Sequence, residues 1–276
     1  MCAVQIRKPA VAGMFYSGNP ETLEREVAVF LENANPEHNV DEIFGLIAPH
    51  AGYMYSGGVA ARAYRQVMDR QYDVVAVISP SHHVYFEKVS VYNGDFYETP
   101  LGTIPVDKEL SLLLAESDPQ LIYSPIGHEG QEHALEVQLP FLQHVLDDFR
   151  LIPIVMGNQN YDNILALSDA LSKVLSGQKA LIVASSDLSH YHPYDVAVRL
   201  DTIVADHVNN FAEDALYDDL ASGVCEMCGG GPVIAMMKAC RNLGADKAKV
   251  ILYRNSGDVT DERSQVVGYL AAMVYR

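Results

Sequence analysis

Apolar segments of strand length alternate with helical patterns along the chain. Segments 149–156 and 179–185 have the continuous apolar character of buried strands, and the pattern at 161–176 between them is helical. Segment 87–106 alternates between apolar and polar residues and is interrupted by Asn93-Gly94, which predicts a hairpin that turns at this pair. Parallel crossovers combined with hairpins predict an α/β fold, with a mixed central β-sheet and helices on both faces.

The remaining predicted elements follow from the same periodicities. They are strands at 43–48, 73–79, 249–254 and 265–275, and helices that begin near residue 19 and at 57–68, 107–116, 132–147, 195–210, 213–221 and 233–243. We expect Ser56 to cap the helix at 57–68. The sequence contains no repeat or long linker, so we expect one domain over residues 1–276.

Three of the predicted strands run straight into polar loops that carry histidine. These loops contain His50, then His82 with His83, and finally His190. In open α/β sheets, ligands bind beyond the carboxyl ends of the strands, so these histidines are candidates for one site. Two imidazoles from neighbouring strand ends supply half of a metal site. Adjacent residues of an extended segment face opposite ways, so we expect only one of His82 and His83 to share a site with His50.

Residues 187–192 form the densest polar cluster of the chain. If the chain turns into a helix here, Asp187 and His190 share a face at positions i and i+3. A carboxylate beside an imidazole fixes its tautomer and keeps it basic, which suits general acid–base chemistry. The alternative is a helix N-cap by Asp187 or Ser189.

Two further segments hold residues of chemical interest. His133 and Glu136 are separated by three positions on a predicted helix, and the alternative is a surface-exposed first turn in which acids favour the helix dipole. Cys228 stands before three glycines and a predicted helix, whose N-terminus is expected to lower the pKa of the thiol. A buried inert cysteine is the alternative reading, and a Cys–His nucleophilic site is another.

Composition narrows the function classes. A formal net charge of −17 argues against nonspecific nucleic-acid binding and against anchoring to anionic membranes. No apolar run approaches the roughly 18–20 residues that span a bilayer, and the N-terminus lacks the apolar region of a secretory signal. We therefore expect a soluble, cytoplasmic protein. The CxxC of Cys225 and Cys228 has no second CxxC to complete a four-thiolate zinc site.

Taken together, two histidines, one thiolate and an Asp–His pair resemble a three-ligand metal site with a base beside it. Ligands of this kind suit Fe(II), zinc or copper. The same residues lie in five ordered motifs that resemble the Memo family, whose bacterial and archaeal members are often labelled the B component of the AmmeMemoRadiSam system. The motifs are Ala48-Pro49-His50-Ala51-Gly52-Tyr53, Pro80-Ser81-His82-His83-Val84, Glu132-His133-Ala134-Leu135-Glu136, Ser185-Ser186-Asp187-Leu188-Ser189-His190 and Cys228-Gly229-Gly230-Gly231-Pro232.

The resemblance implies the fold of class III extradiol-type, non-haem iron dioxygenases. It implies that His50, His82 and Cys228 are the metal ligands, with Fe(II) as the expected metal and copper or zinc as alternatives. The dioxygenases use two histidines and a glutamate, so Cys228 is a departure. A thiolate donates more charge than a carboxylate and is itself oxidisable, which favours softer metals.

The resemblance also assigns roles around the metal. His190 is similar to the catalytic histidine of the dioxygenases, and Asp187 lies beside it. His133 belongs to a family motif whose helix is expected to reach the pocket, so we include it among the candidate catalytic residues. His83 is expected to support the ligands and His192 to line the site.

Three functions are consistent with these residues. The first is a metal-dependent redox enzyme that uses Fe(II), with a small molecule in the metal pocket. The second is a non-catalytic adaptor that binds a metal or a peptide on the same scaffold. The third is partnership with a radical S-adenosylmethionine enzyme in a modification system, which the AmmeMemoRadiSam label implies.

Overall fold

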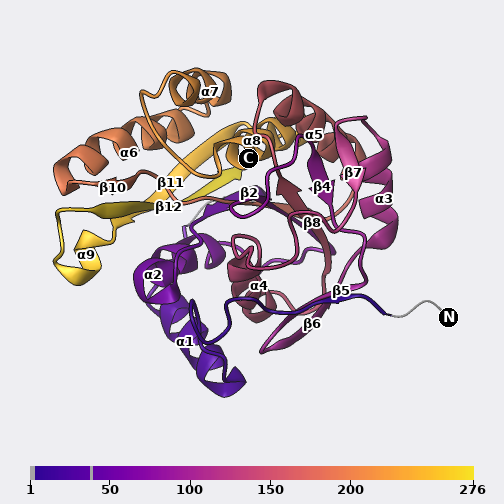
Figure 1. Cartoon of the computed structure of the whole chain (residues 1–276), viewed down its shortest axis with the longest axis horizontal. Helices are drawn as coiled ribbons and strands as arrows, with labels where there is room; N and C mark the ends of the chain where they lie inside the picture. The colour runs from indigo at the N-terminus through magenta and orange to yellow at the C-terminus, as the bar shows by residue number, and fades with distance from the viewer. Residues whose placement is uncertain (1–3, 38–39) are drawn as a thin grey trace.

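A large, twisted β-sheet forms the centre of the molecule, and the computed structural model describes residues 4–37 and 40–276 of the chain (Figure 1). The sheet has nine strands in the order β10-β12-β2-β9-β3-β8-β4-β7, with β11 paired to β12, and a separate sheet has three strands in the order β1-β5-β6. The strands are β1 (Ile6–Arg7), β2 (Ile43–Ala48), β3 (Val74–Pro80), β4 (Val89–Val91), β5 (Phe96–Thr99), β6 (Gly102–Pro105), β7 (Leu121–Tyr123), β8 (Arg150–Met156), β9 (Ala180–Ser185), β10 (His190–His192), β11 (Lys247–Asn255) and β12 (Val266–Tyr275).

Four central strands run parallel, and antiparallel strands extend the sheet on both sides. Strand β9 pairs in parallel with β2 and β3, and β3 pairs in parallel with β8. Strand β12 is antiparallel to β2, and β4 is antiparallel to β8. The sheet is therefore mixed, as predicted, and the fold is consistent with the extradiol-type dioxygenase scaffold that the resemblance implies.

Helices cover both faces of this sheet. They are α1 (Pro20–Glu32), α2 (Tyr53–Tyr64), α3 (Lys108–Glu116), α4 (Leu139–Val145), α5 (Tyr161–Val174), α6 (Tyr194–Asn209), α7 (Glu213–Ala221), α8 (Gly230–Leu243) and α9 (Gly257–Thr260), with a short 3₁₀ helix η1 (Glu136–Gln138). Figure 1 shows α5, α6, α7 and α8 on one side of the sheet, and α1, α2, α4 and the small sheet on the other. In the described part of the chain, no helix combines the length and the apolar character needed to cross a membrane.

Alternation along the strands separates two hydrophobic clusters. On β3, Val74 and Ala76 pack with α5 and α8, whereas Val75 and Val77 pack with α1, α2 and α4. All four side chains are fully buried, because a strand with helices on both faces has no solvent-facing side. This rigid sheet holds the loops at its carboxyl edge in place.

Helix α2 begins earlier than predicted, so the expectation that Ser56 is its N-cap is wrong. The helix starts at Tyr53, whose backbone N–H donates to Phe15 O at 2.7 Å. A carbonyl of the N-terminal segment thus accepts one of the helix N–H groups that would otherwise need a capping side chain. Ser56 lies in the first turn, and its hydroxyl donates to Ala51 O at 2.9 Å.

The prediction of a hairpin that turns at Asn93-Gly94 is also wrong. The antiparallel pair in this region is β5 with β6, and it turns between Thr99 and Gly102. At Asn93-Gly94 the chain instead leaves the large sheet for the small one. There the N–H groups of Asp95 and Phe96 donate to Gln5 O, so a distant segment takes the partner position that the hairpin would have filled.

The long helix predicted at 132–147 is shorter than expected and lacks its first turn. Only η1 and α4 are helical in this range, and Glu132 and His133 precede both of them. The Glu132 carboxylate accepts the N–H groups of His133 and Ala134 at 2.9 and 3.0 Å. Such side-chain bonds to the local backbone compete with helix formation.

Candidate metal centre

The three predicted metal ligands come together at the carboxyl edge of the large sheet. The side-chain ligand atoms of His50, His82 and Cys228 all lie within 4.8 Å of one another. The rings of His50 and His82 are 5.1 Å apart, centroid to centroid. Their strands β2 and β3 are not neighbours as expected, because β9 lies between them. The end of β9 therefore lies between the ends of the two strands that carry the imidazoles.

His50 is held on three sides and is only 2% exposed. Its backbone N–H donates to Asp187 Oδ1 at 2.8 Å, and its Nδ1 lies 2.8 Å from Ser185 Oγ. Its Nε2 lies 3.3 Å from Cys228 Sγ. Burial, followed by the charges of His82 and His133, lowers the pKa of His50 well below its ordinary value. The imidazole is therefore neutral, which is the form that binds a metal.

His82 is oriented by the Glu132 carboxylate. Its backbone N–H donates to Glu132 Oε2 at 2.5 Å, and its Nδ1 lies 3.1 Å from Glu132 Oε1. Burial raises the pKa of Glu132, but hydrogen bonds and charge from His82, with the N–H of Ala134, outweigh it and bring the pKa to about 2. An ionised carboxylate only accepts, so Nδ1 carries the hydrogen and Nε2 is left for a metal.

Cys228 is fixed by backbone groups from the end of β9. The N–H of Asp187 donates to Cys228 Sγ at 3.3 Å, and the N–H of Cys228 donates to Asp187 O at 3.2 Å. The next residue must be glycine, because a Cβ at Gly229 would lie 2.3 Å from Ser185 O. These contacts hold the loop around Cys228 in one conformation and place its sulfur beside His50.

The expectation that a helix N-terminus lowers the pKa of Cys228 is wrong. Burial, followed by the charge of Asp187, raises the pKa of this thiol to about 12. Helix α8 begins only at Gly230, and burial outweighs its dipole. A Cys–His nucleophile needs a thiolate beside an imidazolium, and neither Cys228 nor His50 is in that form. A metal at this site must displace the thiol proton.

The predicted helical pairing of Asp187 with His190 is wrong. Residues 190–192 form β10, which pairs with β12 through His190 and Val267, with Tyr191 at a positive φ of 60°, so the chain is not helical here. Among the hydrogen bonds of the described residues, none joins Asp187 to His190. The Asp187 carboxylate instead accepts the N–H of His50, and burial raises the pKa of this carboxyl to about 7. Asp187 thus ties the loop after β9 to the loop after β2.

His190 and Cys228 share a cavity of about 520 Å³. Its wall also includes Gln159, Glu226 and the apolar side chain of Ile234. Burial lowers the pKa of His190, and a hydrogen bond with the backbone of Leu188 opposes this shift. A larger cavity, of about 650 Å³, lies around residues 101–105 and 147–150 and contains none of the candidate site residues.

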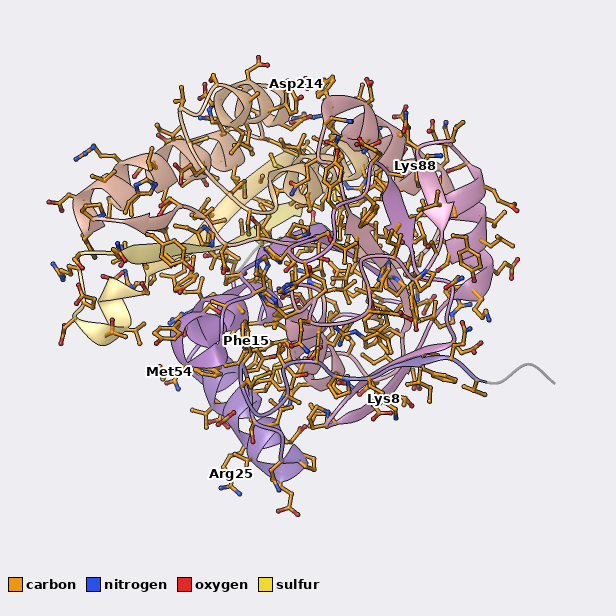
Figure 2. The ribbon with its side chains drawn as sticks, viewed as in Figure 1. Lys8, Phe15, Arg25, Met54, Lys88 and Asp214 are labelled. Carbon is orange, nitrogen blue, oxygen red and sulfur yellow. The ribbon has the colours of Figure 1, made fainter. Side chains whose placement is uncertain are left out.

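His133 lies beside His82, with the two rings nearly parallel at 14° and 5.1 Å apart. Phe15, labelled in Figure 2, also packs against the His133 ring, and the two ring centroids are 4.7 Å apart. His82, Glu132 and His133 form a second group with metal-ligand spacing. We read this group as support for His82, because both oxygens of Glu132 already accept N–H groups.

His83 and His192 lie outside the group of three ligands. The His83 ring is 6.2 Å from that of His133, so His82 is the residue of the pair that faces His50, as expected. His192 Nε2 lies 2.9 Å from Glu226, one of the residues that line the cavity.

Two supporting residues were missed by the sequence analysis. No role of its own was predicted for Glu132, and Ser185 was placed only at the end of a strand. Both lie within motifs that contain site residues, next to His133 and close to Asp187. Their roles depend on contacts with residues far along the chain, which no local pattern reveals.

Comparisons with known proteins identify the family of the chain. Residues 7–273 match the family described as Memo-like protein. A MEMO1 family protein of Methanosarcina mazei is 39% identical, and the alignment covers 98% of this chain and 100% of the relative. A MEMO1 family protein of Methanocaldococcus jannaschii is 36% identical, with coverage of 98% and 99%.

A solved structure shares the fold. The crystal structure of an uncharacterized protein from Escherichia coli K12 has a TM-score of 0.55 with 12% sequence identity, and the match covers 84% of this chain and 100% of that one. At this identity the likeness concerns the fold alone. The match over residues 7–273 and the archaeal relatives carry the assignment. The chain belongs to the Memo family.

Proposed function

We propose that this protein binds one Fe(II) ion through His50, His82 and Cys228 and uses it in redox chemistry on a small molecule. The observation that carries the proposal is the convergence of three ligand atoms within 4.8 Å from three separate loops. Copper and zinc fit the same donors and are the alternatives.

The donor set fits such an ion. Two imidazoles and one thiolate are borderline ligands that suit Fe(II), copper and zinc. Asp187 donates its backbone N–H to the sulfur, which stabilises the thiolate form once the proton has left. When bound, Fe(II) would supply the one-electron chemistry that amino-acid side chains lack.

The cavity beside Cys228 supports a small organic substrate. A volume of about 520 Å³ is in the range of small-molecule sites, and the wall combines apolar side chains with a few polar ones. His190 is neutral because burial lowers its pKa, so it can accept a proton from a substrate hydroxyl. Asp187 positions His50 and is not the partner of His190.

A metal-binding protein without turnover is the second candidate. Cys228 favours it, because the dioxygenases that the chain resembles have a carboxylate at this position and a thiolate is itself open to oxidation. Partnership with a radical S-adenosylmethionine enzyme, and the binding of a peptide in the pocket, remain predictions from the resemblance.

Metal analysis of protein prepared without oxygen tests the ligand set. We expect one metal per chain in the wild type and loss of it in His50→Ala, His82→Ala and Cys228→Ser. His207→Ala is the matched control, because His207 pairs with Asp219 on other helices and belongs to neither ligand group. Retention of metal in any of the three variants would show that the ligand set is wrong.

Oxygen uptake then separates the two candidates. Iron-loaded protein is mixed with a panel of catechols and other small reductants, and O₂ consumption is recorded. Uptake that depends on His190 supports the redox enzyme. Stoichiometric metal with no uptake across the panel supports the binding protein.

A further inference from the structure

We propose that Ser185 and Gln138 are positioning residues that fix the tautomer of His50, so that Nε2 carries the lone pair that faces Cys228. The inference rests on the proposed metal site, but it concerns a property of the protein that is measurable without metal. Neither residue touches the group of three ligands except through His50. Both are fully buried, and they come from β9 and η1.

Ser185 has a single hydrogen to give, and the backbone takes it. Its hydroxyl donates to Ala134 O at 2.7 Å. A carbonyl oxygen has no hydrogen, so the direction of this bond is not in question. Ser185 Oγ is therefore left with two lone pairs, and any other partner must donate to it.

Gln138 fills the first of these lone pairs. Its Nε2 donates to Ser185 Oγ at 2.8 Å and to Pro49 O at 3.0 Å. Its Oε1 accepts the hydroxyl of Tyr64 at 2.8 Å. Rotating the amide by half a turn would set Oε1 against the carbonyl of Pro49, so the surroundings define which end is the donor.

His50 faces the second lone pair. Its Nδ1 lies 2.8 Å from Ser185 Oγ, and at this contact the hydroxyl can only accept. Nδ1 therefore carries the hydrogen of the neutral ring, and Nε2, which lies 3.3 Å from Cys228 Sγ, carries the lone pair. The opposite tautomer would require Ser185 to turn its hydrogen away from Ala134 O, which lies at a fully buried position.

The tautomer is tested by nitrogen NMR of the metal-free protein with labelled histidine. Two-bond correlations distinguish Nδ1–H from Nε2–H, and we expect Nδ1–H at His50 in the wild type. Ser185→Ala should shift the ring toward Nε2–H, since the acceptor for the Nδ1 hydrogen is gone.

An isosteric pair keeps the test decisive if Ser185→Ala does not fold. Ser185→Thr retains the hydroxyl, whereas Ser185→Val has the same shape without it. Both add one methyl group, so any packing cost is shared. We expect Nδ1–H in the threonine variant and a shift toward Nε2–H in the valine variant.

Zinc affinity, measured by competition with a chromophoric chelator, is the second readout. Loss of an outer partner of a metal ligand costs about 10- to 100-fold in affinity, so Ser185→Val should bind zinc that much more weakly than Ser185→Thr. Ser79→Ala is the control, because Ser79 is equally buried on neighbouring β3 and its hydroxyl has no hydrogen-bond partner among the described residues. Its affinity should equal that of the wild type.

The outcomes separate this inference from the proposed function. Nε2–H in the wild type, or the same tautomer in the threonine and valine variants, overturns the inference even if metal binds. The predicted tautomers with no zinc binding in the wild type support the inference and overturn the proposed metal site. Predicted tautomers with a matching loss of affinity support both.

Discussion

The two proposed histidine ligands, His50 and His82, lie in different surroundings. His50 is 2% exposed and is oriented by neutral groups, the hydroxyl of Ser185 and the amide of Gln138 behind it. The side chain of His82 is 28% exposed and is oriented by the carboxylate of Glu132. The Glu132 side chain is itself only 3% exposed, and its charge is compensated by the N–H groups of His82, His133 and Ala134. A buried charge without such donors would cost far more.

This difference indicates that the two proposed ligands differ in how strongly they donate to a metal. A carboxylate makes its histidine a stronger donor, whereas a hydroxyl orients the ring without adding charge. Both supports are buried, so the number of N–H donors around each position decides which kind of support it can have.

Moving the charged support inward should have the largest effect. Ser185→Asp places a carboxylate behind His50, where His50 Nδ1 and the amide of Gln138 are the nearest donors and no lysine or arginine of the described residues bonds to position 185. We expect the free energy of unfolding to fall by about 3–5 kcal/mol, the cost of an uncompensated buried charge. Urea denaturation checks this, with Ser185→Asn as the neutral control of similar shape. Equal stability of the two variants would mean that the number of N–H donors does not decide the kind of support.

Removing the outer support should have the next largest effect. In Glu132→Ala, His82 loses its acceptor and the N–H groups of His133 and Ala134 lose theirs. Zinc affinity should fall by about 100-fold, and stability by about 2 kcal/mol. Glu132→Gln should fall between this variant and the wild type, because it keeps one acceptor without the charge.

Glu129→Ala is the matched control for that experiment. Glu129 belongs to the same loop but is exposed to solvent. Competition titration and urea denaturation should both return wild-type values. A loss of zinc affinity in this variant would indicate that the charge of the loop as a whole, and not the bond to His82, supports the metal.

Changing the pH should have the smallest effect on metal affinity. The pH dependence should show that the proton released on metal binding comes from a single ligand. The pKa of Cys228 is about 12 and that of Glu132 is about 2, so between pH 7.5 and 9 the thiol is protonated and the carboxylate is ionised. Metal binding then releases one proton, from the thiol. Affinity should rise about tenfold for each pH unit, because the metal competes with that proton less as pH rises.

Zinc titrations across this range measure the slope. Cys228→Ser, if it retains measurable affinity, should lose the slope, whereas Glu132→Gln should keep it. A flat profile in the wild type would mean that the thiol is already ionised before the metal arrives.

Much of the fold could be predicted because burial leaves a clear trace in the sequence. Strands such as β2 and β9 are continuous apolar runs, since helices cover both of their faces. The candidate ligands could be named because each follows such a strand or precedes a helix in a motif of the family. Local patterns and the resemblance together predicted that His50, His82 and Cys228 lie close to one another, and the structure places them so.

The features of the fold and the site that could not be predicted depend on contacts between segments far apart in the sequence. The Glu132 carboxylate holds its own backbone out of a helix while it orients His82, fifty positions earlier. Pairing of β10 with β12 keeps His190 extended, so the helical face expected for Asp187 never forms. Likewise, the raised pKa of Cys228 follows from burial by the folded chain, and its sequence neighbours predicted the opposite.

The insertion of β9 between β2 and β3 also sets a time order for the site. During synthesis, both imidazoles leave the ribosome well before β9, and Cys228 follows later still. A nascent chain of 150 residues therefore contains two histidine ligands but neither Ser185 behind them nor the sulfur beside them. Such distant pairings close late in folding. Selective metal uptake at this site should consequently be a post-translational event, and it would report that the whole sheet has closed.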